Sequence, residues 1–98
     1  MNLADVARDL AELPRKAIIY VPRDVLVVGS GTPALLVLAG EEPPAGWRYL
    51  LEVLIAREVL EVWSAWRDGR IPSVEEACDA VVHYADNDAY QPEGQSIP

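Results

Sequence analysis

The sequence predicts a single α+β domain with an N-terminal helix, a four-stranded antiparallel meander and two C-terminal helices packed on one face of the sheet. Apolar residues repeat at helical spacing near both ends of the chain, and short β-branched or aromatic runs lie between them. The connections between those runs are too short for crossover helices, which favours antiparallel pairing. The 98 residues, 51% of them hydrophobic and 24% charged, suit one core.

The first helix is expected from residue 3 to residue 13. Asn2 is placed to cap its N-terminus and Pro14 to end it. Its buried face is expected to consist of Leu3, Val6, Ala7, Leu10 and Leu13.

Four strands are expected next, over residues 17–21, 25–28, 34–39 and 47–55. Residues 29–33, Gly-Ser-Gly-Thr-Pro, are long enough for a hairpin turn, so the second and third strands are expected to pair. A phosphate-binding loop is disfavoured there, because no lysine follows and the next element is a strand. In the fourth strand, one face is expected to carry Tyr49, Leu51, Val53 and Ile55.

Two helices are expected to complete the domain. One runs from about Arg57 to Gly69, with Trp63 and Trp66 on its apolar arc and therefore in the core. The other follows Ser73, which forms a capping-box pattern with Glu76. Its buried stripe is expected to be Val74, Ala77, Cys78, Val81 and Ala85. Residues 1–90 form the expected domain, and residues 91–98, which lack periodicity, form an expected flexible tail.

Negative charge is concentrated near the C-terminus. Sixteen acids and eight bases give a net charge of −8, and no Lys or Arg follows Arg70. Phosphate would be repelled, so nucleic acid is excluded as a partner and a basic protein is favoured. The expected partner-binding residues are the acids Glu75, Glu76, Asp79, Asp86 and Asp88, with Tyr84 and Tyr90 as aromatic anchors. Solvation of this acidic helix face without any partner is the alternative interpretation.

Catalysis is not expected from these residues. The single cysteine, Cys78, and the single histidine, His83, are five residues apart on one helix, which places them about 140° apart around it. They therefore form neither a nucleophile–base pair nor a metal site, and no cofactor is expected. A lone cysteine fits a reducing compartment, and the acidic N-terminus and the lack of a long apolar run predict a cytoplasmic protein outside the membrane.

Several segments together resemble known small bacterial domains. These are Leu13-Pro14, the run Ala17-Ile18-Ile19-Tyr20-Val21-Pro22, and Gly46-Trp47-Arg48-Tyr49, which leads through a strand into the helix at Arg57. Over residues 3 to 90 the chain resembles uncharacterised bacterial domains and the immunity proteins encoded beside contact-dependent inhibition and other polymorphic toxins. The resemblance implies a protein without catalysis that binds a toxin domain from a sibling cell. Such toxins are often basic nucleases, and no residue role is common to the family.

The expected function is therefore that of an immunity-type protein, which neutralises a cognate toxin domain through an acidic surface. The alternative is a non-catalytic structural or regulatory subunit that homodimerises, or docks on a larger complex, through its strands or tryptophans. The expected oligomeric state is a monomer or a weak homodimer; a monomer favours the inhibitor, and a concentration-independent dimer that buries Trp47 favours the subunit.

Overall fold

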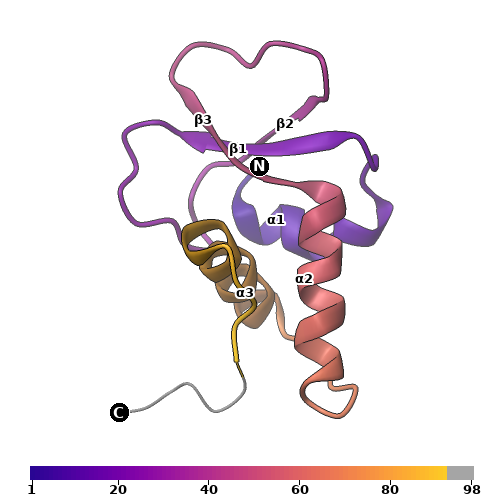
Figure 1. Ribbon diagram of the computed structural model, residues 1–98. Helices are drawn as coiled ribbons and strands as arrows, with labels where there is room; N and C mark the ends of the chain where they lie inside the picture. The colour runs from indigo at the N-terminus through magenta and orange to yellow at the C-terminus, as the bar shows by residue number, and fades with distance from the viewer. Residues whose placement is uncertain (93–98) are drawn as a thin grey trace.

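The computed structural model describes residues 1–92, and within them it has an α+β fold with a three-stranded antiparallel sheet (Figure 1). The predicted fold class is confirmed. Figure 1 shows the three α-helices on one side of the sheet. In chain order the elements are α1 (Leu3–Arg8), the 3-10 helix η1 (Leu10–Glu12), β1 (Ala17–Pro22), β2 (Leu35–Leu38), β3 (Trp47–Glu52), α2 (Val53–Ala65) and α3 (Val74–Asn87).

The sheet has the strand order β2-β1-β3, with β1 in the centre and antiparallel to both neighbours. The prediction of a four-stranded meander is wrong. Residues 25–28 form no strand, and residues 35–38 pair with β1 instead of with them, for example through Ile18 opposite Val37. Because β1 already has a neighbour on each edge, it offers no place to a further strand.

Residues 25–28, Val-Leu-Val-Val, form part of the loop between β1 and β2. The side chains of Leu26 and Val27 are 93% and 87% exposed. The loop is held at its two ends: Arg48 donates a hydrogen bond to the Val25 carbonyl (3.0 Å), and the Gly29 amide donates to Thr32 Oγ1 (2.8 Å). The predicted hairpin is therefore absent, although residues 29–32 do form a turn.

That turn supports the N-terminal helix. The amides of Leu3 and Ala4, at the start of α1, donate to the carbonyls of Thr32 and Ser30, each at 2.9 Å. Asn2 caps α1 as predicted and forms a capping box with Asp5. The helix is shorter than predicted, because regular α-helix ends at Arg8 and continues as η1.

A β-bulge in β3 changes which side chains face the core. Ile19 lies opposite Leu51 and Tyr20 lies opposite Tyr49, so Leu50 is the extra residue. Leu50 and Leu51 are both buried, whereas Tyr49 lies on the open face and packs edge-on against Tyr20. The predicted common face for Tyr49 and Leu51 is wrong for this reason.

Helix α2 starts at Val53, immediately after β3, and not near Arg57 as predicted. Its buried residues, Val53, Ala56, Val59 and Trp63, follow helical spacing from the first position. Trp63 is 4% exposed, as expected for a core residue. Trp66 is 48% exposed, so its predicted place in the core is wrong. Trp66 is the C-cap residue of α2, where the helix ends and no further turn covers it.

One core lies between the sheet and the helices. It takes alternate residues of β1 (Ala17, Ile19 and Val21), Leu3, Val6 and Leu10 from the N-terminal helices, and Cys78, Ala80 and Val81 from α3. No helix in residues 1–92 is long and apolar enough to cross a membrane. Of the predicted flexible tail, residues 93–98 lie outside the described part of the chain, while the carbonyls of Gln91 and Pro92 accept hydrogen bonds from Arg67.

Candidate partner-binding surface

The exposed face of α3 carries a stripe of carboxylates, formed by Glu75, Asp79 and Asp86. On a helix with 100° per residue these three positions fall within about 40° of one another. The stripe lies opposite the buried side chains of Ala77 and Ala80. All three acids are exposed, and none forms an ion pair within residues 1–92. The stripe is therefore an uncompensated negative surface, which we call the acidic stripe.

Glu76, by contrast, is engaged inside the chain. Its carboxylate accepts a hydrogen bond from the Ser73 amide (3.0 Å) and two from the guanidinium of Arg70 (3.0 and 3.2 Å). The Ser73 hydroxyl in turn accepts a hydrogen bond from the Glu76 amide, so the predicted capping box is confirmed. These bonds, chiefly the one from the Ser73 amide, lower the pKa of Glu76 to about 2. Glu76, one of the five acids predicted to bind a partner, is therefore used to cap the start of α3 and to pair with Arg70.

Tyr84 and Tyr90 belong to a separate surface. Their ring centroids are 5.2 Å apart, and Tyr90 also packs edge-on against Trp66 at 5.9 Å. We call these three residues the aromatic cluster. Tyr84 lies about 140° around α3 from Asp79 and about 160° from Asp86. The structure therefore divides the predicted site residues between two sides of α3.

Carboxylates flank the aromatic cluster as well. Asp88 is the C-cap residue of α3 in the left-handed conformation (φ 53°), and its amide donates to the Tyr84 carbonyl (2.7 Å). The pKa of the Tyr84 hydroxyl is raised, first by desolvation and then by the charges of Asp88 and Glu58 and by Tyr90. Glu58 comes from α2, two helical turns before Trp66 and on the same side of that helix.

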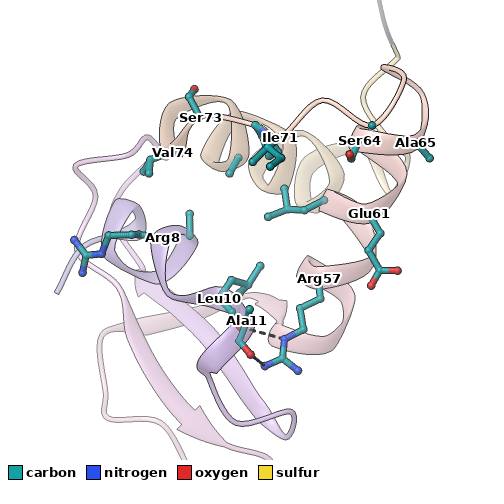
Figure 2. A pocket seen from close by; sticks show the side chains of 15 residues that line it. Arg8, Leu10, Ala11, Arg57, Glu61, Ser64, Ala65, Ile71, Ser73 and Val74 are labelled. Atoms are coloured by element: carbon teal, nitrogen blue, oxygen red, sulfur yellow. Dashed lines mark hydrogen bonds between the residues drawn. The ribbon is translucent and has the colours of Figure 1, made fainter.

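A groove of about 850 Å³ opens elsewhere, where α1 and η1, α2 and the start of α3 meet (Figure 2). Its walls are mostly apolar, with Leu10, Leu60 and Val74 among them, and Ile71 lies exposed at its rim. Arg8 stands at one end and is paired with Asp5 and Asp9.

Arg57 is the charged side chain that reaches across the groove from α2, as Figure 2 shows. Its guanidinium donates to the carbonyls of Leu10 (3.1 Å), Ala11 (3.0 Å) and Leu13. These carbonyls terminate η1, so Arg57 acts as a C-terminal cap supplied by another helix. The bonds use Nε and Nη2 of the guanidinium, and the other walls of the groove offer mainly apolar contact.

Cys78 and His83 lie on different sides of α3. Cys78 is buried, and its burial, with the nearby charges of Glu75 and Asp79, raises the pKa of the thiol to about 11. A thiol with this pKa is protonated and a poor nucleophile. His83 is partly exposed and its Nδ1 lies 3.4 Å from the side-chain amide of Asn87. Within residues 1–92, no group of three or more His, Cys, Asp or Glu side chains is placed to hold a metal ion.

No protein-family model, curated protein or solved structure matches the chain. The candidate surface comprises the acidic stripe, the aromatic cluster and the carboxylates that border it. Two of its residues, Glu58 and Trp66, were missed from the sequence. The spacing of Glu58, Val62 and Trp66 at intervals of four residues does place them on one side of α2, but it does not indicate that the C-terminal end of that side is uncovered.

Proposed function

We propose that this protein is an immunity-type inhibitor that binds a cognate bacterial toxin domain and neutralises it without catalysis. The observation that carries the proposal is the acidic stripe: Glu75, Asp79 and Asp86 are exposed on one helix face, and no ion pair compensates them. Retaining unpaired like charges on one face is unfavourable for the isolated fold, whereas it favours association with a basic protein.

The acidic stripe acts at a distance. Charge complementarity raises the rate of association more than it raises the final affinity. Because the Debye length is about 8 Å at physiological ionic strength, the carboxylates on the exposed face of α3 attract a basic partner as it approaches that face, before any side chains make contact. The stripe thus steers the toxin, and packed side chains nearby hold it.

Co-expression with the product of the neighbouring reading frame tests this function. We expect that product alone to arrest growth, and co-expression of this chain to restore growth and to yield a complex that purifies as one species. A matched pair of variants sharpens the experiment: Asp79→Lys with Asp86→Lys alters the stripe, and Glu41→Lys with Glu42→Lys makes the same charge change in the loop after β2. A harmless neighbour, or arrest that persists despite expression of the folded chain, would refute the proposal.

A second candidate function is that of a subunit that homodimerises or docks through its loop at residues 25–28. Leu26 and Val27 are almost completely exposed in a β-prone run that pairs with no strand of the described chain. Light scattering after size-exclusion chromatography tests this candidate. A dimer that Leu26→Asp with Val27→Asp dissociates favours it, whereas a monomer at every concentration excludes homodimerisation and leaves only docking on another protein.

A further inference from the structure

The aromatic cluster is held in place by the chain itself. Arg67, just after the end of α2, donates to the Trp63 carbonyl (3.0 Å) and to the carbonyls of Gln91 (3.3 Å) and Pro92 (3.2 Å). These bonds fasten the segment after α3 to the end of α2, so that Tyr90 reaches both Trp66 and Tyr84. Figure 1 shows this segment running down from α3 to about the level of the lower end of α2. The cluster is therefore preorganised for contact.

The two neighbouring tryptophans of α2 differ in what covers them. The guanidinium carbons of Arg67 and Arg70 lie 4.2 and 4.7 Å from the ring centroid of the buried Trp63. In residues 1–92, by contrast, no cation lies over Trp66, Tyr84 or Tyr90. Trp66 is half-exposed, and its ring surface is available for a cation from outside the chain.

Negative charge borders the same rings. Asp88 ends α3, with its amide hydrogen-bonded to the Tyr84 carbonyl, and Glu58 lies on α2 two turns before Trp66; neither carboxylate forms an ion pair within the described residues. An aromatic surface with carboxylates at its border is complementary to a flat cation that stacks on a ring and donates hydrogen bonds at its edge. Arginine has this chemistry, whereas the compact lysine ammonium lacks the planar stacking surface.

We infer that the aromatic cluster, bordered by Glu58 and Asp88, is the contact point for an arginine side chain of the protein partner. The guanidinium stacks on Trp66 or Tyr90 and donates to a carboxylate at the border. This inference rests on the proposed function and names the part of the surface that contacts the toxin. The acidic stripe on the other side of α3 then steers the partner without touching this arginine.

Nuclear magnetic resonance of the ¹⁵N-labelled full chain tests the inference with a defined probe, the peptide acetyl-Gly-Arg-Gly-amide. The counterpart peptide with citrulline in place of arginine has nearly the same shape and no charge. We expect the Trp66 indole N–H and the amides of Tyr84 and Tyr90 to shift progressively with the arginine peptide and much less with the citrulline peptide.

Matched variants complete the experiment. Trp66→Ala is expected to weaken binding of the arginine peptide by about 2- to 5-fold. Tyr49→Ala, which removes an equally exposed ring from the open face of the sheet, is expected to leave it unchanged. The double variant Glu58→Gln, Asp88→Asn is likewise expected to weaken binding of the arginine peptide. The double variant Glu75→Gln, Asp79→Asn, which alters the acidic stripe, is expected to weaken it much less. Asparagine tolerates the left-handed conformation at residue 88, so the fold is retained.

Equal shifts with both peptides, or shifts centred on the acidic stripe, would overturn the inference. So would an unchanged affinity in the Glu58→Gln, Asp88→Asn variant. The growth assay separates this outcome from failure of the proposed function. If the chain neutralises the toxin but the resonances of the aromatic cluster do not respond to the arginine peptide, only the arginine contact is refuted. If the product of the neighbouring reading frame is harmless but the arginine peptide binds at the aromatic cluster, only the toxin-inhibitor function is refuted.

Discussion

Arg70 and Glu76 join the loop after α2 to the first turn of α3: Arg70 Nη2 lies 3.0 Å from Glu76 Oε2. Arg70 also lies over the ring of Trp63, so one side chain contacts the core tryptophan of α2 and the capping box of α3. The last base of the sequence is thus used to orient the helix that carries the acidic stripe.

Glu76→Gln tests this link through its dependence on pH. The pKa of Glu76 in the folded chain, about 2, lies below its ordinary value of 4.5. The charged carboxylate therefore contributes stability above about pH 4.5, and the contribution is lost as the pH falls toward 2. We expect the variant to melt below the wild type near neutral pH and the difference to shrink across this window. Thermal melts followed by circular dichroism measure it.

Glu75→Gln is the matched control for that experiment, because Glu75 is in the same turn and accepts no described hydrogen bond. Its effect on the melting temperature is expected to be small throughout. A Glu76→Gln deficit of constant size from neutral pH down to pH 2 would contradict a role for the charged carboxylate.

Trp63→Ala and Trp66→Ala form a second pair with opposite expectations. Trp63 is buried beneath two guanidinium groups, so truncating it is expected to cost about 3–5 kcal/mol of unfolding free energy. Trp66 is half-exposed, and its truncation is expected to cost about 1 kcal/mol or less. Urea denaturation followed by circular dichroism gives both values. Equal losses would mean that Trp66 belongs to the core after all.

Those two tryptophans also show where sequence reasoning about the fold succeeds and fails. The helical arc of α2 places both of them on its apolar side, but the pattern does not say which turns a neighbouring element covers. The capping box of Ser73 and Glu76 was predicted correctly because its partners are three residues apart. Residues 25–28 have a strand-like composition, but they lie in a loop, and residues 35–38 take the place beside β1 that a meander would give to them. Which of the two segments pairs with β1 depends on contacts between residues far apart in the sequence, which local composition does not reveal.

The candidate site was likewise predictable in part. The spacing of Glu75, Asp79 and Asp86 correctly predicts one exposed face of α3. Tyr84 does not belong with these acids, because its position around α3, about 140° from Asp79, directs it toward α2. The pairing of Arg70 with Glu76 was missed because it depends on the course of the loop before the helix.

Arg57→Met is expected to loosen the attachment of η1 to α2. The guanidinium serves the carbonyls of Leu10, Ala11 and Leu13, and hydrogen bonds from charged donors contribute about 1.5–3 kcal/mol each when buried. Because this site is partly exposed, we expect a loss of about 1–2 kcal/mol in total. Hydrogen exchange is expected to accelerate at the amides of Glu12 and Leu13.

Arg8→Met, at the other end of the groove, removes only exposed ion pairs and is expected to cost under about 0.5 kcal/mol.

The thiol of Cys78 is expected to report global unfolding. Burial raises its pKa to about 11, with the charges of Glu75 and Asp79 adding to the effect, so little thiolate exists near neutral pH. We expect alkylation by iodoacetamide to be slow in the native protein and to accelerate with the urea transition. Alkylation at the same rate in folded and unfolded protein would show that the thiol is accessible in the fold.

The proposed function predicts that reversing Asp79 and Asp86 to lysine slows association with a toxin domain. The two residues are seven positions apart and only about 20° apart around α3, so both changes fall on the acidic stripe. Electrostatic steering contributes at least about tenfold to the rates of strongly steered complexes, and a loss of this order is expected at low salt. The dissociation rate is expected to change much less, because the stripe lies outside the proposed aromatic contact.

The salt dependence of that rate decides where the steering charge resides. Stopped-flow mixing over a range of ionic strength is expected to show a steep decline for the wild type and a nearly flat response for the stripe variant. Glu41→Lys with Glu42→Lys makes the same change of net charge in the loop between β2 and β3, which Figure 1 shows beyond the sheet from α3. That control is expected to retain most of the rate and its slope. Equal slowing by both pairs would assign the effect to net charge, and the acidic stripe would then have no special part in recognition.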